Sequence, residues 1–213
     1  MYKGLLCDLD GTLADSEPLH CRVWLALLEE GYGQHYDEHW FEQWVGTSDR
    51  VVAGWLLEQH DWDTTVDQLI GQKQDRFHAA VRAEASTFVG VPEMLERIAR
   101  RFPLAIATNS GRADADLMIA CTGLDRFTDV SVTASDVEHM KPEPDIYLLA
   151  AERLGLAPDT CIAIEDSGPG GVAAKAAGCY LIGLTDKVTE ADEFAGSNAE
   201  ALQRAYALLD GGE

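Results

Sequence analysis

Two aspartates stand two residues apart near the start of the chain, directly after the apolar stretch Gly4-Leu5-Leu6-Cys7. The apolar pattern from Gly4 to Leu9 predicts a short strand that is buried on both faces, as in a parallel sheet. Open α/β sheets bind their ligands beyond the carboxyl ends of the strands, where Asp8 and Asp10 would lie. Two buried carboxylates need a cation, and Mg²⁺ suits a few carboxylates combined with substrate phosphate.

A structural interpretation of the same stretch is also open. Asp10-Gly11 is a common turn sequence, and Asp8 could be a solvated strand end. Short motifs of this kind often occur by chance. The choice therefore depends on polar residues elsewhere in the chain.

Further polar residues follow other predicted strands, and they are Thr108, Asn109, Lys141, Glu165 and Asp166. The carboxyl ends of parallel strands meet at one edge of a sheet, so these side chains could converge on one crevice with the two N-terminal aspartates. Each also has an ordinary explanation. Thr108-Asn109 fits a helix N-cap, Lys141 a solvated loop lysine, and Glu165-Asp166 an acidic helix start. Their shared placement favours a site.

These residue types suit the transfer of a phosphoryl group. Asp8 could attack phosphorus, and Asp10 could pass a proton to and from the leaving oxygen. Asp8 and Asp166 could hold Mg²⁺ against the phosphoryl oxygens. Lys141 supplies fixed positive charge, and the Thr108 hydroxyl could bind a phosphoryl oxygen together with backbone N–H groups near Asn109.

From residue 86 onwards the chain alternates strands with helices, which implies a parallel sheet with helices on both faces. The predicted strands are Gly4–Leu9, Leu104–Ala107, Val130–Thr133, Cys161–Ile164 and Tyr180–Leu184. The predicted helices are Pro92–Arg101, Arg112–Cys121, Asp145–Leu154, Val172–Ala177 and Asn198–Leu209. The segment Gly168-Pro169-Gly170-Gly171 reads as a loop, and it lacks the glycine and lysine spacing of a nucleotide-binding loop.

Residues 15–85 predict a helical insertion after the first strand, because no convincing strand is predicted between residues 14 and 86. We expect an α/β core of residues 1–14 and 86–213 and a helical domain of residues 15–85. All five tryptophans fall in the helical segment, and they are Trp24, Trp40, Trp44, Trp55 and Trp62. We expect them to form its small core, with an aromatic substrate cage as the alternative.

The composition limits the partners. The 213 residues include 37 acidic and 16 basic side chains, and the net charge of -21 argues against nucleic acid and anionic membranes. The five cysteines form no Cys-x-x-Cys pair, which indicates reduced thiols. No apolar run approaches the length of a membrane span, so we expect a cytoplasmic protein. Its expected oligomeric state is a monomer or a homodimer.

Taken together, the polar segments resemble the four motifs of the haloacid dehalogenase superfamily of phosphohydrolases. The resembling segments, in the order of the four motifs, are Asp8-Leu9-Asp10-Gly11-Thr12-Leu13, Thr108-Asn109, Lys141-Pro142, and Glu165-Asp166-Ser167 with Gly170. The helical insertion resembles the cap of phosphoglycolate phosphatases, sugar-phosphate phosphatases and β-phosphoglucomutases. The four motifs occur in the expected order and anchor essentially the whole core.

The resemblance implies a Rossmann-like core and an aspartyl-phosphate intermediate. Asp8 would be the nucleophile and Asp10 the general acid and base. Mg²⁺ would be held by Asp8, Asp166 and the backbone carbonyl of Asp10, with Glu165 close by. The expected function is hydrolysis of a small phosphorylated metabolite, of the sugar phosphate or phosphoglycolate type. The alternatives are a β-phosphoglucomutase-like mutase and a catalytically silent protein that binds a phosphorylated ligand.

Three residues of the helical segment fall roughly where mutase-like members carry polar residues on the substrate side: His20, Arg50 and Lys73. Such cations would help an acidic protein to bind a phosphorylated substrate. Their ordinary explanations are a partly exposed helix histidine and solvated helix charges. The segment from Asp15 to His20 is similar to the hinge and first cap helix of both the sugar phosphatases and the mutases.

Overall fold

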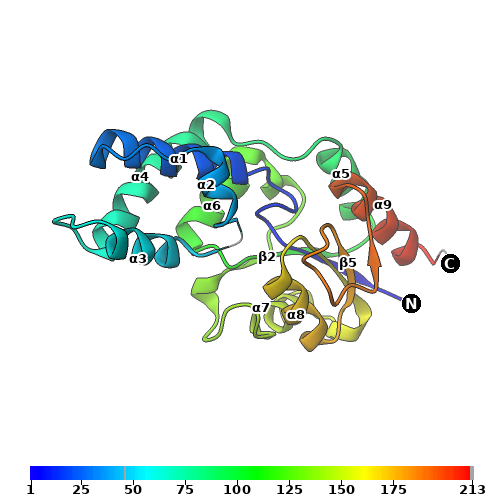
Figure 1. Cartoon of the computed structure of the whole chain (residues 1–213). Coiled ribbons are helices and arrows are strands. Elements are labelled where there is room, and N and C mark those ends of the chain that lie inside the picture. Colours follow the sequence, from blue (N-terminus) through cyan, green and yellow to red (C-terminus); the bar gives the residue numbers. More distant parts are fainter. Residues whose placement is uncertain (46, 212–213) are drawn as a thin grey trace. The chain divides into compact units, whose positions relative to one another are not determined.

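A computed structural model describes residues 1–45 and 47–211 (Figure 1). The chain folds into two compact units. The first unit comprises Met1–Asp15 with Ser86–Glu213, and the second comprises Ser16–Ala85. Asp15, which we expected to open the helical segment, lies in the first unit. Residue 46 belongs to the expected helical domain and residues 212–213 to the expected core, but all three lie outside the described residues.

In the described part of the first unit, six parallel strands form one sheet in the order β3-β2-β1-β4-β5-β6. The strands are β1 Gly4–Cys7, β2 Leu104–Ala107, β3 Ser131–Val132, β4 Cys161–Glu165, β5 Tyr180–Gly183 and β6 Glu193–Phe194. β1 lies between β2 and β4, and the strand order runs outwards from it on both sides. Such a switch point is where α/β sheets form a crevice beyond the strand ends.

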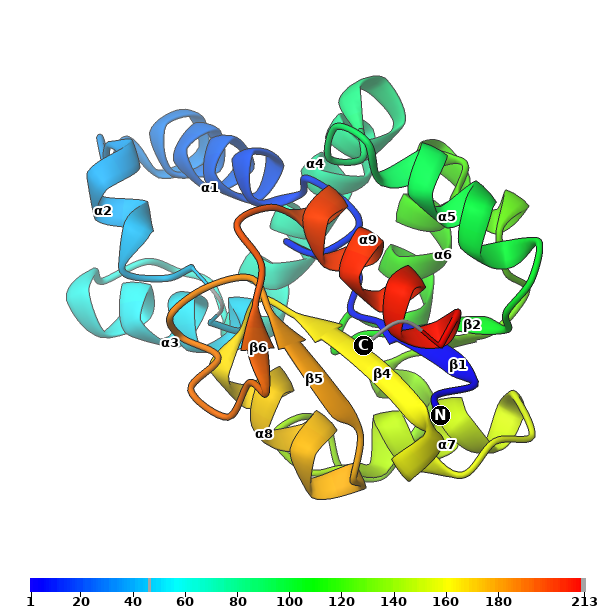
Figure 2. The same cartoon turned by 90° about the vertical axis from the view of Figure 1, so that its right-hand side faces the viewer.

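Helices cover both faces of this sheet (Figure 2). They are α5 Val91–Ala99, α6 Arg112–Thr122, α7 Asp145–Arg153, α8 Gly168–Ala177 and α9 Asn198–Leu209, with short helical turns η1 Leu124–Arg126, η2 Ala134–Asp136 and η3 Pro158–Thr160. Strand residues alternate between the faces. Leu6 and Ala163 are buried in a cluster with Tyr147 of α7, while Leu5 and Cys7 are buried on the opposite face. The predicted α/β, Rossmann-like fold is confirmed.

Two elements have the bounds that the sequence predicts. β2 and α9 have the predicted bounds, whereas β1 ends at Cys7, so that Asp8 and Leu9 lie beyond the strand. The prediction that residues 168–171 form a loop is wrong, because α8 begins at Gly168. Ser167 caps this helix by accepting from the Gly170 N–H. Pro169 lies in the first turn of α8, where a backbone N–H has no partner within the helix. The missing N–H of proline therefore does not disturb the helix there.

The second unit, called the helical unit below, consists of α1 Glu17–Tyr32, α2 Glu38–Glu42, α3 Asp49–Gln59 and α4 Val66–Glu84, with no strand among its described residues. Trp24 is fully buried in its core, and the other tryptophans pack around the same cluster. This confirms the tryptophan core. Of the helices that the structure describes, none combines the length and apolar character needed to cross a membrane.

Candidate active site

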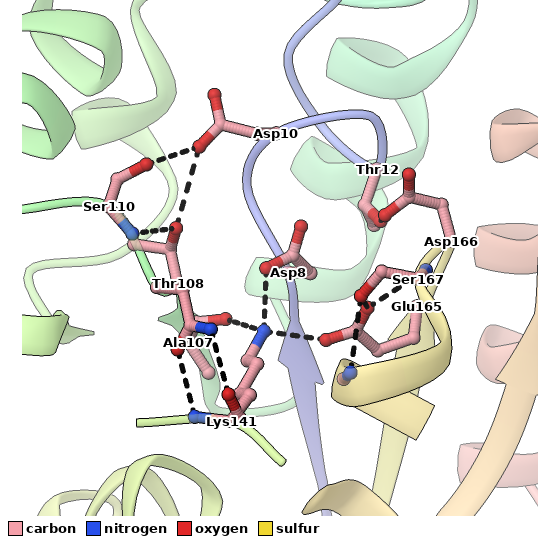
Figure 3. A network of polar contacts seen from close by, with 12 residues as sticks. Asp8, Asp10, Thr12, Ala107, Thr108, Ser110, Lys141, Glu165, Asp166 and Ser167 are labelled. Atoms are coloured by element: carbon pink, nitrogen blue, oxygen red, sulfur yellow. Dashed lines mark hydrogen bonds and ion pairs between the residues drawn. The ribbon is translucent and has the colours of Figure 1, made fainter. Parts of the chain in front are cut away.

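Lys141 is the centre of a buried polar cluster at the carboxyl end of β1 (Figure 3). Its Nζ donates to Asp8 Oδ1 at 2.6 Å, to Glu165 Oε1 at 2.5 Å and to the Ala107 carbonyl at 2.8 Å. The lysine side chain is only 3% exposed. These partners follow or end the three central strands, so the sheet register alone brings them to one point.

The charges of this cluster are unbalanced. Burial raises the pKa of Asp8, and the nearby carboxylates of Glu165, Asp166 and Asp10 raise it further, although Lys141 counteracts them. Burial alone would lower the pKa of Lys141, but Asp8 and Glu165 outweigh burial and raise it. The lysine therefore stays cationic between the carboxylates of Asp8 and Glu165, while Asp10 and Asp166 add negative charge near Asp8.

Glu165 is held on both carboxylate oxygens. Its Oε1 also accepts from the buried Tyr147 hydroxyl at 2.7 Å, and its Oε2 accepts from the Ser167 N–H at 3.3 Å and from the Ser167 hydroxyl at 3.0 Å. A Cβ at Gly170 would collide with this carboxylate, so glycine is required there. Glu165 is fully buried and fixed in place before any ligand arrives.

The turn after β1 is shaped by a glycine and by a side chain from α9. Gly11 has a positive φ of 76°, and a Cβ there would collide with the Asp166 carboxylate. Asn198 Nδ2 donates to the carbonyls of Gly11 and Thr12 at 3.0 and 2.8 Å. Thr12 Oγ1 in turn donates to Asp166 Oδ1 at 3.3 Å. The glycine of the motif therefore lets Asp166 approach the two N-terminal aspartates.

Asp10 contacts the loop that follows β2. Ser110 Oγ donates to Asp10 Oδ2 at 2.6 Å, and Thr108 Oγ1 lies 3.5 Å from the same oxygen. Asn109, on the same loop, contacts the backbone of Lys141 through its side chain. The expected residues Thr108, Asn109 and Lys141 are thus brought together with both aspartates.

The acidic members of the cluster fit a hard divalent cation. Asp8, Glu165 and Asp166 each offer a carboxylate oxygen, and these oxygens lie within 4.8 Å of one another. Mg²⁺ prefers oxygen ligands of this kind, and the excess of negative charge around Asp8 would be offset by a cation. Glu165 already accepts four hydrogen bonds, so Asp8 and Asp166 are the better placed ligands.

The second unit has a polar cluster of its own around Lys73. This lysine is 1% exposed, and its Nζ lies 2.7 Å from His20 Nδ1 and 2.7 Å from Asp49 Oδ2. The His20 ring stacks on Phe77 at 4.1 Å. Asp49 also accepts from Trp24 Nε1 at 2.9 Å. The interpretation of Lys73 as a solvated lysine is wrong, because the side chain is buried and paired.

Arg50 lies outside this cluster. Its guanidinium donates to Asp67 Oδ1 at 2.6 Å, and both side chains are exposed. The structure thus brings two of the three expected cap residues together and places the third in a surface ion pair.

Four residues with clear roles in these clusters were absent from the sequence prediction: Ser110, Tyr147, Asn198 and Asp49. Ser110 lies within the polar segment after β2, so its position was a usable signal. The others lie at or near helix starts or inside a helix, where their residue types are common, and only the folded contacts identify them.

Comparison with known proteins identifies relatives of this chain in both sequence and structure. A family model for haloacid dehalogenase-like hydrolases matches residues 2–178. The fructose-1-phosphate phosphatase YqaB of Escherichia coli (strain K12) is 33% identical over 177 residues, covering 83% of this chain and 93% of that protein. The validoxylamine A 7'-phosphate phosphatase of Streptomyces hygroscopicus subsp. limoneus is 32% identical, covering 98% and 93%. The crystal structure of CbbY from Rhodobacter sphaeroides in complex with phosphate is 27% identical, with a TM-score of 0.80 and coverage of 94% and 96%.

Proposed function

The chain belongs to the haloacid dehalogenase-like hydrolase family, and on this premise we propose that it hydrolyses a small phosphorylated sugar or a similar metabolite. The observation that carries the proposal is the buried Lys141 ammonium group between Asp8 and Glu165, with Asp166 alongside. Two of the relatives are named as phosphatases of phosphorylated compounds, which supports a phosphoric monoester as the substrate.

In the first half of the proposed reaction, Asp8 attacks phosphorus and the bond to the ester oxygen breaks. Asp10 gives its proton to the departing alkoxide. Lys141 balances the charge of the phosphoryl oxygens, while the Thr108 hydroxyl and N–H groups near Asn109 donate to them. The product of this half is a phosphorylated Asp8 and a free alcohol.

In the second half, water replaces the alcohol. Asp10, now a carboxylate, takes a proton from the water as its oxygen attacks phosphorus. The bond from phosphorus to Asp8 breaks, and inorganic phosphate leaves. Asp10 thus ends the cycle protonated, as it began, and one group serves as acid and then as base.

We assign the Mg²⁺ site to Asp8, Asp166 and the backbone carbonyl of Asp10, with Glu165 beside them. When bound, the ion would neutralise charge on the phosphoryl oxygens. Glu165 also holds Lys141 in place, because its Oε1 accepts a hydrogen bond from the Lys141 ammonium group. In this proposal the helical unit selects the substrate, and its closure excludes water. Of the three expected cap residues, Lys73 is buried and paired and Arg50 is in a surface ion pair, so His20 is the better candidate contact.

Replacement of the nucleophile tests the proposal. Asp8→Asn should reduce phosphate release from every substrate by at least about a thousandfold, because a neutral amide is a poor nucleophile. Asp159→Asn, which changes an exposed aspartate on η3, serves as the matched control and should retain activity. A screen of sugar phosphates, phosphoglycolate and nucleotides supplies the substrate, and far-UV circular dichroism verifies folding. Undiminished turnover by pure Asp8→Asn protein would refute the scheme.

The phosphomutase alternative uses the same core residues and differs only in the acceptor of the phosphoryl group. Incubation with β-glucose 1-phosphate and a sugar bisphosphate separates the two activities by product. Glucose 6-phosphate would identify a mutase, whereas glucose and free phosphate would identify a phosphatase.

A further inference from the structure

Resting on the proposed function, we propose that Ser110 is the positioning residue of the acid and base Asp10. Its hydroxyl holds Asp10 Oδ2, so that Oδ1 is the oxygen that exchanges a proton with the leaving group and with water. Ser110 thereby acts on the reaction through Asp10 and not through contact with the substrate.

The contact is short and directed at one oxygen. Ser110 Oγ lies 2.6 Å from Asp10 Oδ2, which is within the range for a strong hydrogen bond from a hydroxyl to a carboxylate. The other carboxylate oxygen of Asp10 points away from both Ser110 and Thr108 (Figure 3). One oxygen is therefore fixed by the protein, and the other is presented outward.

Thr108 is a weaker partner for the same carboxylate. Its hydroxyl lies 3.5 Å from Asp10 Oδ2, at the limit of a hydrogen bond. The Thr108 oxygen also accepts from the Ser110 N–H at 3.0 Å. Ser110 is therefore the principal holder of Asp10, and Thr108 holds Ser110.

Ser110 is itself fixed in the backbone on both sides. Its N–H is bonded to Thr108, and its carbonyl accepts from the Ala134 N–H at 3.2 Å. Two residues later, Arg112 begins α6. The backbone of Ser110 is thus fixed, and its hydroxyl is a rigid support for the Asp10 side chain. The turn after β1 that carries Asp10 is held separately by Asn198.

A positioning role predicts a dependence on the leaving group. An alkyl phosphate needs a proton on its leaving oxygen, whereas p-nitrophenolate leaves without one. Ser110→Ala should therefore lower kcat/KM by about tenfold or more for the alkyl substrate found in the screen, because a misplaced acid transfers its proton poorly. For p-nitrophenyl phosphate the loss in kcat/KM should stay within about threefold.

Two further variants separate this role from a structural one. Ser110→Thr keeps a hydroxyl and should recover most of the alkyl phosphate activity. When Asp10 is already replaced by Asn, adding Ser110→Ala should lower kcat/KM for the alkyl phosphate by less than about a further twofold, because the two residues act as one unit. Ser86→Ala, at an exposed serine, is the matched control.

Equal losses for alkyl and aryl phosphates would overturn the inference and leave the proposed function intact. A raised KM at unchanged kcat would also overturn it, because Ser110 would then contact the substrate directly. Failure of the wild-type protein to release phosphate from any ester would overturn the proposed function, and this inference with it.

Discussion

Asn109 and Lys141 are joined by a reciprocal pair of hydrogen bonds. The Lys141 N–H donates to Asn109 Oδ1 at 2.9 Å, and Asn109 Nδ2 donates back to the Lys141 carbonyl at 3.2 Å. The amide side chain therefore pairs with the peptide groups on either side of the lysine Cα. It fixes the point from which the lysine side chain reaches into the buried cluster.

Loss of this pairing should slow catalysis. Asn109→Ala removes both bonds, and we expect kcat to fall by about tenfold to a hundredfold as the Lys141 ammonium group shifts. Asn109→Asp keeps an acceptor for the Lys141 N–H and should lose less. Steady-state kinetics on the best substrate from the screen decide the matter. An unchanged kcat for Asn109→Ala would show that the loop holds the lysine without help.

The Tyr147 hydroxyl should contribute to stability. Tyr147→Phe leaves buried Glu165 Oε1 with one donor fewer, and we expect the free energy of unfolding to fall by about 1–2 kcal/mol. The ring remains beside the Lys141 ammonium group, which lies 5.0 Å from its centroid. Urea unfolding measures the change. The control Tyr180→Phe, at a half-buried strand position, should change stability by less than about 0.5 kcal/mol.

Metal removal should abolish the proposed activity. We expect a chelator to stop phosphate release and added Mg²⁺ to restore it, because the carboxylates around Asp8 would otherwise repel a phosphate. Mg²⁺ should also raise the melting temperature of the wild-type protein, since a ligand stabilises the state that binds it. Asp166→Asn should lose most of that shift, whereas Asp159→Asn should keep it. An equal shift in both variants would place the ion elsewhere.

Asp136 should make stability sensitive to acid. Burial opposes ionisation of this residue, but hydrogen bonds from Thr133 and the guanidinium groups of Arg153 and Arg112 outweigh it and lower its pKa. A carboxyl group whose native pKa lies below its unfolded value stabilises the fold at higher pH. This contribution begins to fall below about pH 4 and is lost as the pH passes through the native pKa.

Asp136→Asn measures that contribution directly. At pH 6 we expect the variant to lose about 2 kcal/mol of unfolding free energy, a typical value for hydrogen bonds to a charged group. Below about pH 4 the difference from wild type should narrow. Urea unfolding at a series of pH values tests both statements. If the difference in unfolding free energy between wild type and Asp136→Asn grew as the pH fell, the native pKa of Asp136 would lie above its unfolded value, contrary to this prediction.

Lys73 and Arg50 should differ in their effect on stability. Lys73→Met removes the ion-pair partner of Asp49 inside the helical unit, and we expect a loss of about 2–3 kcal/mol. Arg50→Met removes an exposed ion pair, and the expected change is below about 1 kcal/mol. Urea unfolding followed by far-UV circular dichroism compares the two. Equal losses would mean that burial of the Lys73 pair contributes nothing.

The sequence was most informative where apolar runs and polar motifs coincide. β2 and the carboxylate partners of Lys141 could be predicted because buried strands and the groups at their ends leave a local pattern. α9 could be predicted because its buried residues recur at helical spacing. β6 was missed because its two residues, Glu193 and Phe194, are too few to show alternation.

The start of α8 was mispredicted because its glycines resemble a loop. Gly170 is required by the approach of the Glu165 carboxylate, which is a contact of the folded state. Ser110 and Tyr147 were missed for a related reason. A hydroxyl gains its role from the carboxylate that it reaches, and that partner lies far away in the sequence.

The confinement of every tryptophan to Ser16–Ala85 gives the protein a built-in optical probe. Indole fluorescence reports on the helical unit alone, without background from the residues proposed to carry the chemistry. Trp24 is bonded through its Nε1 to Asp49, the ion-pair partner of Lys73, so one emitting group is coupled to the buried cation. Rapid mixing with an unlabelled phosphate ester could therefore time the response of this unit separately from product formation.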